Sequence, residues 1–455
     1  MRPGASRAGS EAVWASIAPG LFGGTIWALA PWPAAALGPV LIAAGAFASP
    51  LGGLLVIVAT LPFSDWAARH AAVGIPLTEL AFVAAATGAL ARHGRSDWGA
   101  TFRAGVERAR GPHVAPILLL LAAAALSLLA TEYPRLSLRM LRTVVVEPVA
   151  FYYFARLTLT TPQRGQLAAT ALVAGVTIAC AWALIAYASA GTTIAGQIDP
   201  RARGPFQSPN NLSLVIGRAL PMALALALVG GTTSRGAASA AGAAIQCAAL
   251  LASRSVGGWL SVAVSTVAFI GQVATRRTTV AAIAALALAA VAASLSPWVR
   301  TRMDPTTGTS LARVQLWTVG VEMLRDHPIL GIGLDNFLYR YPAYFAPGTA
   351  FEPNLSHPHN VVLDAWLSLG LLGPVAFGWL ILAFFRQAAK QDVSSDRGNR
   401  DYLRAAVVAS MVDFIVHGLL DNSYFVAELA YIFWLTLALP DAIRAPEQDE
   451  TRVPD

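Results

Sequence analysis

The sequence predicts an all-α polytopic integral membrane protein with about 12–14 transmembrane helices. Of the 455 residues, 56% are hydrophobic and only 13% are charged, whereas a soluble domain carries about a quarter charged residues. The apolar residues form long uncharged blocks, of which residues 114–130 and 279–298 are clear examples. Each block is about long enough to cross a hydrocarbon core of roughly 30 Å at 1.5 Å per residue. The bilayer therefore takes the place of the single hydrophobic core of a protein in water, and the chain length does not predict the number of domains.

Apolar segments along the chain give the candidate spans in order. Two of them, 33–49 and 50–62, are short and separated only by Ser49 and Pro50, so they could merge or form a re-entrant pair. The segments lie near residues 17–31, 33–49, 50–62, 75–91, 114–131, 139–157, 165–188, 211–231, 237–253, 256–275, 279–297, 361–385, 402–419 and 424–440.

The polar stretches between the spans divide the chain into four parts. Residues 1–297 form an N-terminal transmembrane bundle, and 298–360 form a periplasmic loop with an interfacial helix. Residues 361–443 form the C-terminal transmembrane helices, and 444–455 a cytoplasmic tail.

Basic residues in the short loops set the expected orientation. The loop 92–112 holds five arginines, so the positive-inside rule places it in the cytoplasm. If successive spans alternate in direction from this loop, the other purely basic short loops and both termini also lie on the cytoplasmic side. The loop 189–210, the long segment 298–360 and the turn at Asp421 then face the opposite side.

The outer face carries arginines, although the positive-inside rule disfavours basic residues on that side. The net charge is +7, but no basic stripe is interleaved with aromatic residues, so no nucleic-acid partner is expected. Arginine presents a planar donor fork that matches phosphate oxygens. Alternatively, these arginines pair with acidic residues of the same loop. The arginines are Arg201, Arg203, Arg254, Arg300, Arg302, Arg313, Arg325 and Arg340, and the acids are Asp304, Glu322, Asp326, Asp335 and Glu352.

The long outer segment contains an expected amphipathic helix over residues 310–328. Its apolar residues recur at steps of three and four, which predicts one stripe lying in the membrane interface. The stripe consists of Leu311, Val314, Trp317, Val321 and Leu324. Gly331 and Gly333 follow the helix, but a nucleotide-binding loop would need a third glycine and a βαβ context.

Two histidines stand directly before an apolar run at residues 355–373. Histidine is the side chain whose pKa lies nearest neutrality, so His359 and His357 are candidates for a general base. Alternatively, His359 caps the helix that begins near Val361. A His-x-His metal site with Asp364 is a further alternative, but no third strong ligand lies at recognisable spacing, so no metal is expected.

Charged residues within the spans suggest further roles. Arg135, Arg139 and Arg142 share one helix face and could extend a track for an anionic lipid headgroup. Glu147 and Arg218 lie at equal depth below the outer ends of their helices, which suggests a buried ion pair. His417 and Asp421 return to the outer face, either as capping groups or as part of the same cavity as the histidines.

Five segments resemble the family of O-antigen ligases and polymerases, which are bacterial membrane glycosyltransferases of the C-type fold. Residues 313–317, 327–337 and 357–373 are similar to its signature region. Residues 201–213 resemble its Arg-x-x-Gly-x-Phe-x-x-x-Asn segment, and 251–259 its Ser-Arg-Gly corner, although Ser255 and Val256 replace the more usual Gly-Ala.

The resemblance implies transfer of a glycan from a polyprenyl (undecaprenyl) diphosphate to a sugar hydroxyl at the periplasmic face of the inner membrane. The acceptor would be a growing glycan, lipid A core or a protein, and the sequence leaves these open. His359 would be the base with His357 beside it, and Asn210 and Asn360 would contact substrate; no cofactor is expected. The diphosphate would bind Arg203, Arg254 and Arg313, with Arg139 extending the track.

Two other classes of protein are alternatives to this prediction. A transporter of a small solute should concentrate its ionisable groups near the midplane on broken, repeated helices. Here they concentrate in one outer loop and at helix ends, which favours surface chemistry on a lipid-borne substrate. A non-catalytic flippase partner would not need the histidines and arginines.

Overall fold

The computed structural model describes residues 4–31, 34–71, 74–93, 110–190, 200–345, 355–389 and 399–444, and within them every regular element is helical. The N-terminal helices are α1 (Gly4–Leu29), α2 (Leu37–Ala48), α3 (Pro50–Thr60), α4 (Ser64–His70), α5 (Leu77–His93), α7 (Val114–Ser127), α8 (Pro134–Met140), α9 (Glu147–Thr158) and α10 (Pro162–Ala190). Then come α11 (Pro209–Gly230), α12 (Ser234–Ser253), α13 (Val256–Val273), α14 (Arg276–Leu295), α15 (Pro297–Met303), α16 (Gly308–Asp326) and α17 (Phe337–Arg340). The last are α18 (Val361–Leu369), α19 (Leu372–Ala389), α20 (Asn399–Gly418) and α21 (Ala427–Arg444).

Short non-α turns join several of these helices. The 3₁₀ turns are η1 (Ala34–Ala36), η2 (Leu61–Phe63) and η4 (Tyr341–Tyr344), and η3 (Leu141–Val146) is a π-helix between α8 and α9. The expectation of an all-α polytopic membrane protein is confirmed.

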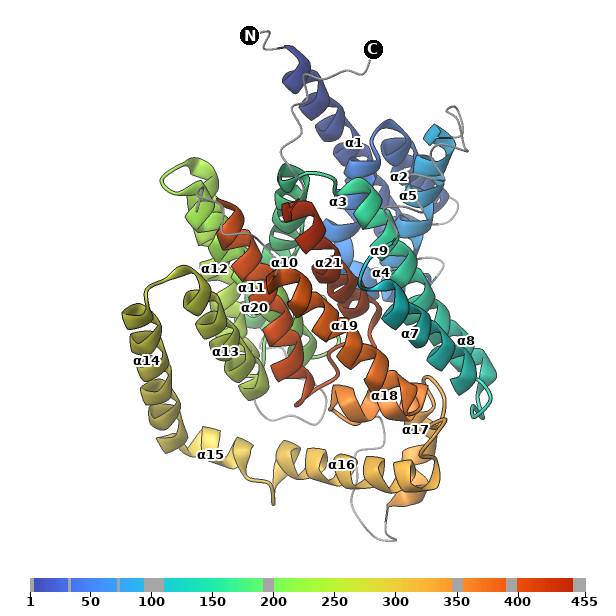
Figure 1. Cartoon of the computed structure of the whole chain (residues 1–455), viewed down its shortest axis with the longest axis vertical. Coiled ribbons are helices and arrows are strands. Elements are labelled where there is room, and N and C mark those ends of the chain that lie inside the picture. The colour runs from blue at the N-terminus through green and yellow to red at the C-terminus, as the bar shows by residue number, and fades with distance from the viewer. Residues whose placement is uncertain are drawn as a thin grey trace.

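Seven helices in the described part of the chain are long and apolar enough to cross a membrane. They are Pro50–His70, Pro162–Ser189, Pro209–Gly230, Ser234–Ser253, Val256–Val273, Arg276–Leu295 and Leu372–Ala389. Ser16–Leu29, Ala34–Ala48 and Val114–Ser127 are shorter apolar helices. The span α14 has no buried residue and stands at the edge of the molecule, where it packs against α13 and leaves most of its surface exposed (Figure 1).

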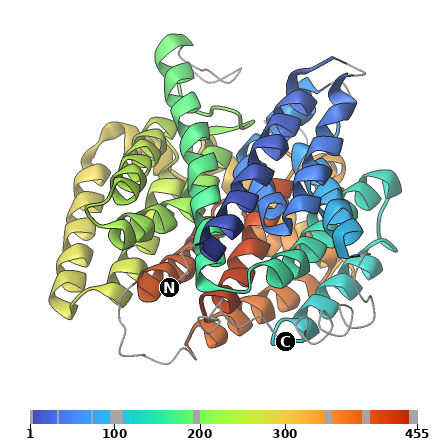
Figure 2. The same cartoon turned by 90° about the horizontal axis from the view of Figure 1, so that it is seen from above.

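The bundle is built around α11, most of whose residues are buried. It packs against α10, α12, α13 and α20. Viewed from above, the red C-terminal helices lie between the green helices and the blue and cyan ones (Figure 2). Because α20 contacts α11 and α13 while α21 contacts α9 and α10, this last pair ties the two sides together.

Two helices cross one end of the bundle instead of running along it. α15 and α16 lie across the end opposite to that where α1 begins and α21 ends (Figure 1). The helix expected over residues 310–328 is therefore present as α16, and it ends at Asp326, just before Pro328. Val314 and Val321 of the expected interfacial stripe are exposed, and a second apolar face that the sequence analysis did not single out, with Leu316, Val319 and Met323, is buried against Leu367 and neighbouring residues.

Two interruptions separate segments that the sequence left continuous or ambiguous. Ser49 has an extended backbone and caps α3, so α2 and α3 are separate helices. The expected span 361–385 is broken at Gly370, whose φ of 70° interrupts the helix. Only α19 is then long enough to span, and α18 is a separate nine-residue helix that follows the histidines.

The expected pair of Glu147 with Arg218 is wrong. Arg218 is fully buried and forms its ion pair with Asp413 on α20, and it also donates a hydrogen bond to the hydroxyl of Ser423. Glu147 lies 3.8 Å from Arg142 instead. Equal depth in two helices did not bring the two side chains together, because α20 lies against the face of α11 that carries Arg218.

Some expectations fall on residues outside those described. They concern Arg95, Arg103, Arg108, Glu352, Lys390, Arg397 and almost all of the tail 444–455.

Candidate active site

A cavity of about 420 Å³ opens at the end of the bundle that α16 crosses. Its walls come from the segment before α11, the corner between α12 and α13, helices α15 and α16, the histidine segment before α18, and the loop between α20 and α21. Residues far apart in the chain therefore meet in one polar space.

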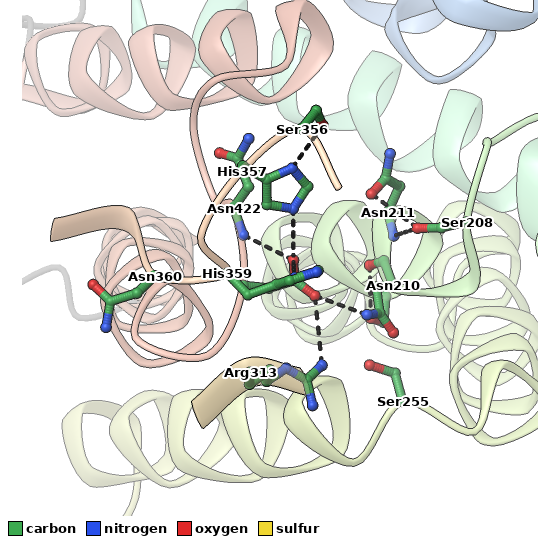
Figure 3. A network of polar contacts seen from close by, with 12 residues as sticks. Ser208, Asn210, Asn211, Ser255, Arg313, Ser356, His357, His359, Asn360 and Asn422 are labelled. Atoms are coloured by element: carbon green, nitrogen blue, oxygen red, sulfur yellow. Dashed lines mark hydrogen bonds and ion pairs between the residues drawn. The ribbon is translucent and has the colours of Figure 1, made fainter. Parts of the chain in front are cut away.

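Asp421 lies at the centre of the polar network. Its Oδ1 accepts hydrogen bonds from Nδ1 of His359 at 2.7 Å and from the backbone N–H of Asn422 at 2.8 Å (Figure 3). The same oxygen is 3.4 Å from Nε2 of His357. Its Oδ2 accepts a hydrogen bond from the Asn210 amide at 2.8 Å and lies 3.9 Å from Nη2 of Arg313. One carboxylate thus connects both histidines with an amide and a guanidinium group.

The surroundings keep this carboxylate ionised. Burial by itself would raise the pKa of Asp421, since only 4% of its side chain is exposed. The charge of His359 and the hydrogen bonds with His357 and His359 outweigh burial and hold the pKa of Asp421 well below its usual range. An ionised acceptor next to Nδ1 favours the imidazole tautomer, or the imidazolium, that carries a proton on that nitrogen.

The backbone of the histidine segment is held in an uncommon conformation. His359 has a φ of 52°, and its carbonyl oxygen accepts a hydrogen bond from the Trp317 indole at 3.3 Å. Among the described residues other than glycine, positive φ occurs at Arg254, Asp335 and His359, and all three line the cavity. Backbone strain of this kind persists where surrounding structure fixes it, and it concentrates at functional sites.

The residue that caps α18 is Asn360. Its Oδ1 accepts hydrogen bonds from the backbone N–H groups of Val362 and Leu363, at 3.0 and 3.1 Å. Its amide donates to the carbonyl oxygen of Leu419. His359 is therefore free of the capping role considered from the sequence, and Asn360 supports the site through the backbone instead of lining the cavity.

Four arginines line the cavity: Arg201, Arg254, Arg302 and Arg313. Arg201 is buried, and its guanidinium donates to the Ser253 carbonyl at 2.7 Å and to Oδ1 of Asn210 at 3.0 Å. Burial lowers the pKa of Arg201 to about 10, with Arg302, Arg313 and Arg254 adding to the effect and Asp421 opposing it. The four cations therefore repel one another, and an anion in the cavity would relieve this repulsion.

An aromatic ring holds two of these arginines in place. Trp298 lies with its ring centroid 5.9 Å from Cζ of Arg254 and 5.2 Å from Cζ of Arg302. It also packs on Trp259 of α13 at 5.7 Å. Trp298 thereby joins α15 to α13 at the side of the cavity.

The structure brings together only some of the residues singled out from the sequence. His357, His359, Asn210, Arg254 and Arg313 line the cavity. Of the described residues, the lining does not include Arg203 or Arg139. Arg203 donates to the Gln207 carbonyl at 3.3 Å, and Arg139 is 65% exposed and lies 3.4 Å from Asp335.

Three residues of the site were not assigned to it from the sequence. Arg201 is the first arginine of the Arg-x-x-Gly-x-Phe-x-x-x-Asn pattern, so strict alignment to that pattern would have found it. Asp421 was considered mainly as a cap, and Arg302 was one of many outer arginines. The carboxylate needed by a histidine base lies 62 residues further along the chain, where spacing gives no signal.

His357, His359 and Asp421 could also hold a metal ion, since their ligand atoms lie within 4.8 Å of one another. The third member of this group is Asp421 rather than Asp364. A divalent cation here would face Arg313 beside the same carboxylate and three further arginines in the same cavity. The electrostatic surroundings thus suit an anion better than a cation.

Residues 241–378 match a family model described as O-Antigen ligase. The match confirms the family indicated by the sequence motifs, and it includes Arg254, Arg302, Arg313 and both histidines. Asp421, Arg201 and Asn210 lie outside it and reach the site only through the fold. A search of curated proteins found no match for the chain.

Proposed function

Because residues 241–378 belong to the O-antigen ligase family, we propose that this membrane glycosyltransferase moves a glycan from a polyprenyl diphosphate to a sugar hydroxyl. The observation that carries the proposal is the position of Asp421 between a histidine pair and an arginine cluster. Glycan transfer from a lipid diphosphate needs both parts, a base for the acceptor and cations for the leaving group.

In the proposed reaction, His359 acts as the general base. Asp421 holds the proton on Nδ1, so Nε2 keeps the lone pair that accepts a proton from the acceptor hydroxyl. The hydroxyl oxygen then forms a bond to the anomeric carbon as the bond from that carbon to the diphosphate oxygen breaks. His357, whose ring centroid is 4.4 Å from that of His359, positions the neighbouring imidazole.

The arginines stabilise the departing lipid diphosphate. Arg254, Arg302 and Arg313 present guanidinium groups toward one cavity, with Arg201 buried behind Asn210. Charge-assisted hydrogen bonds to phosphate oxygens are strong and bidentate, and they strengthen as negative charge develops. The arginines can supply this stabilisation without a metal ion, so we propose a metal-independent reaction.

The position of the cavity suits a substrate that lies partly in the membrane. The lipid tail can remain among the spanning helices while the diphosphate and glycan reach the end crossed by α16. We place this end at the periplasmic face of a bacterial inner membrane, with both termini in the cytoplasm. The acceptor then arrives from the periplasm, as lipid A core, a growing glycan or a protein.

The test is glycan transfer by His359→Ala, scored as a glycan ladder from cells with equal amounts of the variant in the membrane. General base catalysis is worth about 10²–10⁴-fold, so the ladder should disappear. His357→Ala should lose less, because only one imidazole needs to reach the hydroxyl. His70→Ala is a matched control, since His70 is exposed and lies outside the cavity lining. A full ladder from His359→Ala would overturn the proposed base.

A further inference from the structure

The cavity has a second side that the proposed reaction does not use. Apart from Asp421, its lining includes four carboxyl side chains, Asp65, Asp335, Asp364 and Glu428. Asp364 faces His357, Asp335 and the hydroxyl of Ser368, whereas Arg201 faces the other three arginines. The part of the cavity around Asp364 and Asp335 is therefore its acidic side, and the part around Arg201 is its cationic side.

Asp364 carries an unused hydrogen-bonding atom on this acidic side. Only 4% of its surface is exposed, and its Oδ1 accepts a hydrogen bond from the Ser368 hydroxyl at 3.2 Å. Within the described part of the chain, its Oδ2 is buried and has no hydrogen-bond partner. A buried polar atom without a partner is costly, which indicates that a ligand supplies the partner when the cavity is filled.

Aromatic side chains also form part of the cavity wall. Phe337 and Phe425 both line the cavity and are held by neighbouring rings, Tyr341 at 5.1 Å and Tyr424 at 5.3 Å. A wall of fixed apolar groups with a few converging polar atoms suits a ligand that has both C–H faces and hydroxyl groups. A sugar ring has this combination.

The acidic side also restricts the charge of that ring. Burial raises the pKa of Asp364 to about 7, so above that pH Asp364 is a carboxylate and, with Asp335, would repel a carboxylate on the sugar. A neutral ring avoids this repulsion and can donate a hydroxyl hydrogen to Oδ2 of Asp364. His357 lies between this side and the arginines, so a ring bound here would have its anomeric carbon next to the histidines.

We propose that Asp364, with Ser368 and the flanking aromatic rings, forms a subsite for the donor sugar attached to the diphosphate, and that it selects a neutral sugar over an acidic one. This inference rests on the proposed function, because the arginines must bind the diphosphate for the sugar to reach the subsite.

The experiment measures binding of three soluble donor analogues to the purified full chain in nanodiscs, by titration calorimetry at about pH 8, above the raised pKa of Asp364. The analogues are the methyl ester of farnesyl diphosphate, glucosyl farnesyl diphosphate and glucuronosyl farnesyl diphosphate. The first two carry the same charge, so their difference reports the sugar alone. One hydrogen bond or one repulsive contact corresponds to about tenfold in affinity. We expect the glucosyl compound to bind about tenfold more tightly than either of the others.

Two variants separate hydrogen bonding from charge. Asp364→Asn keeps an acceptor oxygen but removes the negative charge. The affinity for the glucuronosyl compound should therefore come within about threefold of that for the glucosyl compound, and the glucosyl compound should keep most of its affinity. Asp364→Leu removes the acceptor, so the glucosyl compound should bind no more tightly than the methyl ester. The methyl ester should bind both variants as it binds the wild type, which also shows that they are folded. Asp304→Asn, at an aspartate that does not line the cavity, should keep the preference for glucose.

The outcomes distinguish this inference from the proposed function. If the wild-type protein binds none of the analogues, the diphosphate site and the sugar subsite both fail. If it binds the methyl ester and the glucosyl compound equally well, the subsite alone is refuted. Unchanged discrimination in Asp364→Asn, with normal binding of the methyl ester, would likewise refute the role of Asp364.

Discussion

His359 and Asp421 are 62 residues apart in the chain and are joined by a hydrogen bond of 2.7 Å. The first belongs to the strained segment before α18, and the second to the loop between α20 and α21. This bond connects the part of the chain that carries the family signature with the C-terminal helix pair. In the proposed reaction this bond orients the imidazole of His359, and only the fold brings Asp421 to it.

The first prediction follows from that bond. Asp421→Asn keeps the shape but removes the charge that holds the proton on Nδ1, so transfer should fall by at least about 100-fold. The measurement is the initial rate of glycan transfer at equal protein levels in membranes. Asp304→Asn is the matched control, because Asp304 is a partly exposed aspartate of the outer segment that does not line the cavity. Near-normal transfer by Asp421→Asn would remove the proposed orientation of His359.

The second prediction concerns the arginines of the cavity. Arg254→Lys and Arg313→Lys each keep the charge but lose the planar fork, so the KM for the lipid-linked donor should rise by about tenfold or more. Arg203→Lys should behave as the wild type, because the Arg203 side chain turns to the Gln207 carbonyl outside the cavity lining. The reverse ranking, with Arg203 sensitive and Arg313 insensitive, would place the diphosphate elsewhere.

The third prediction concerns metal ions. His357, His359 and Asp421 could hold one, but the arginines beside them favour an anion. Transfer in membranes washed with a chelator should therefore match transfer in untreated membranes. If activity is lost and a divalent ion restores it, the three residues are metal ligands and the base mechanism is wrong.

The sequence predicted the membrane class well because long apolar blocks have one explanation in physical terms, the thickness of the hydrocarbon core. It also brought together His357, His359, Arg254, Arg313 and Asn210 as candidates, because these residues lie in short segments similar to one family. Pairing across the bundle was harder to predict. The partners of Arg218 and His359 lie on α20 and just after it, and nothing in the spacing of apolar residues shows which helix faces abut.

The buried face of α16 illustrates the same limit. Periodicity correctly predicted a helix, but it did not predict that a face other than the one with Val314 and Val321 would pack against protein. The helix packs against α18 as well as lying across the bundle, so the face with Leu316 and Met323 is buried instead. A helix with apolar residues on more than one face does not specify which face meets protein and which meets lipid.

The fourth prediction tests the buried ion pair inside the bundle. Asp413→Ala leaves the fully buried Arg218 without its counter-charge, which should cost about 3–5 kcal/mol of stability. Thermal unfolding in detergent should show a clear drop, and Arg218→Met combined with Asp413→Leu should recover much of it. A double-mutant cycle between Glu147 and Arg218 should show no coupling, since these side chains are not partners. Coupling there, and none between Arg218 and Asp413, would contradict the observed packing.

The last prediction concerns which side of the membrane the site faces. Ser356 is exposed beside the histidines, and Arg277 is exposed at the start of α14. If the site faces the periplasm, a cysteine at Ser356 should react with an impermeant thiol reagent added to spheroplasts, and a cysteine at Arg277 should react only after lysis. Cys247 is exposed and should be replaced by Ala first, whereas Cys180 is buried and can remain. Because α14 is a single span between Arg277 and the segment that leads to the site, the two positions must lie on opposite sides. The reverse labelling pattern would put the histidines in the cytoplasm, where an acceptor assembled outside the membrane could not reach them.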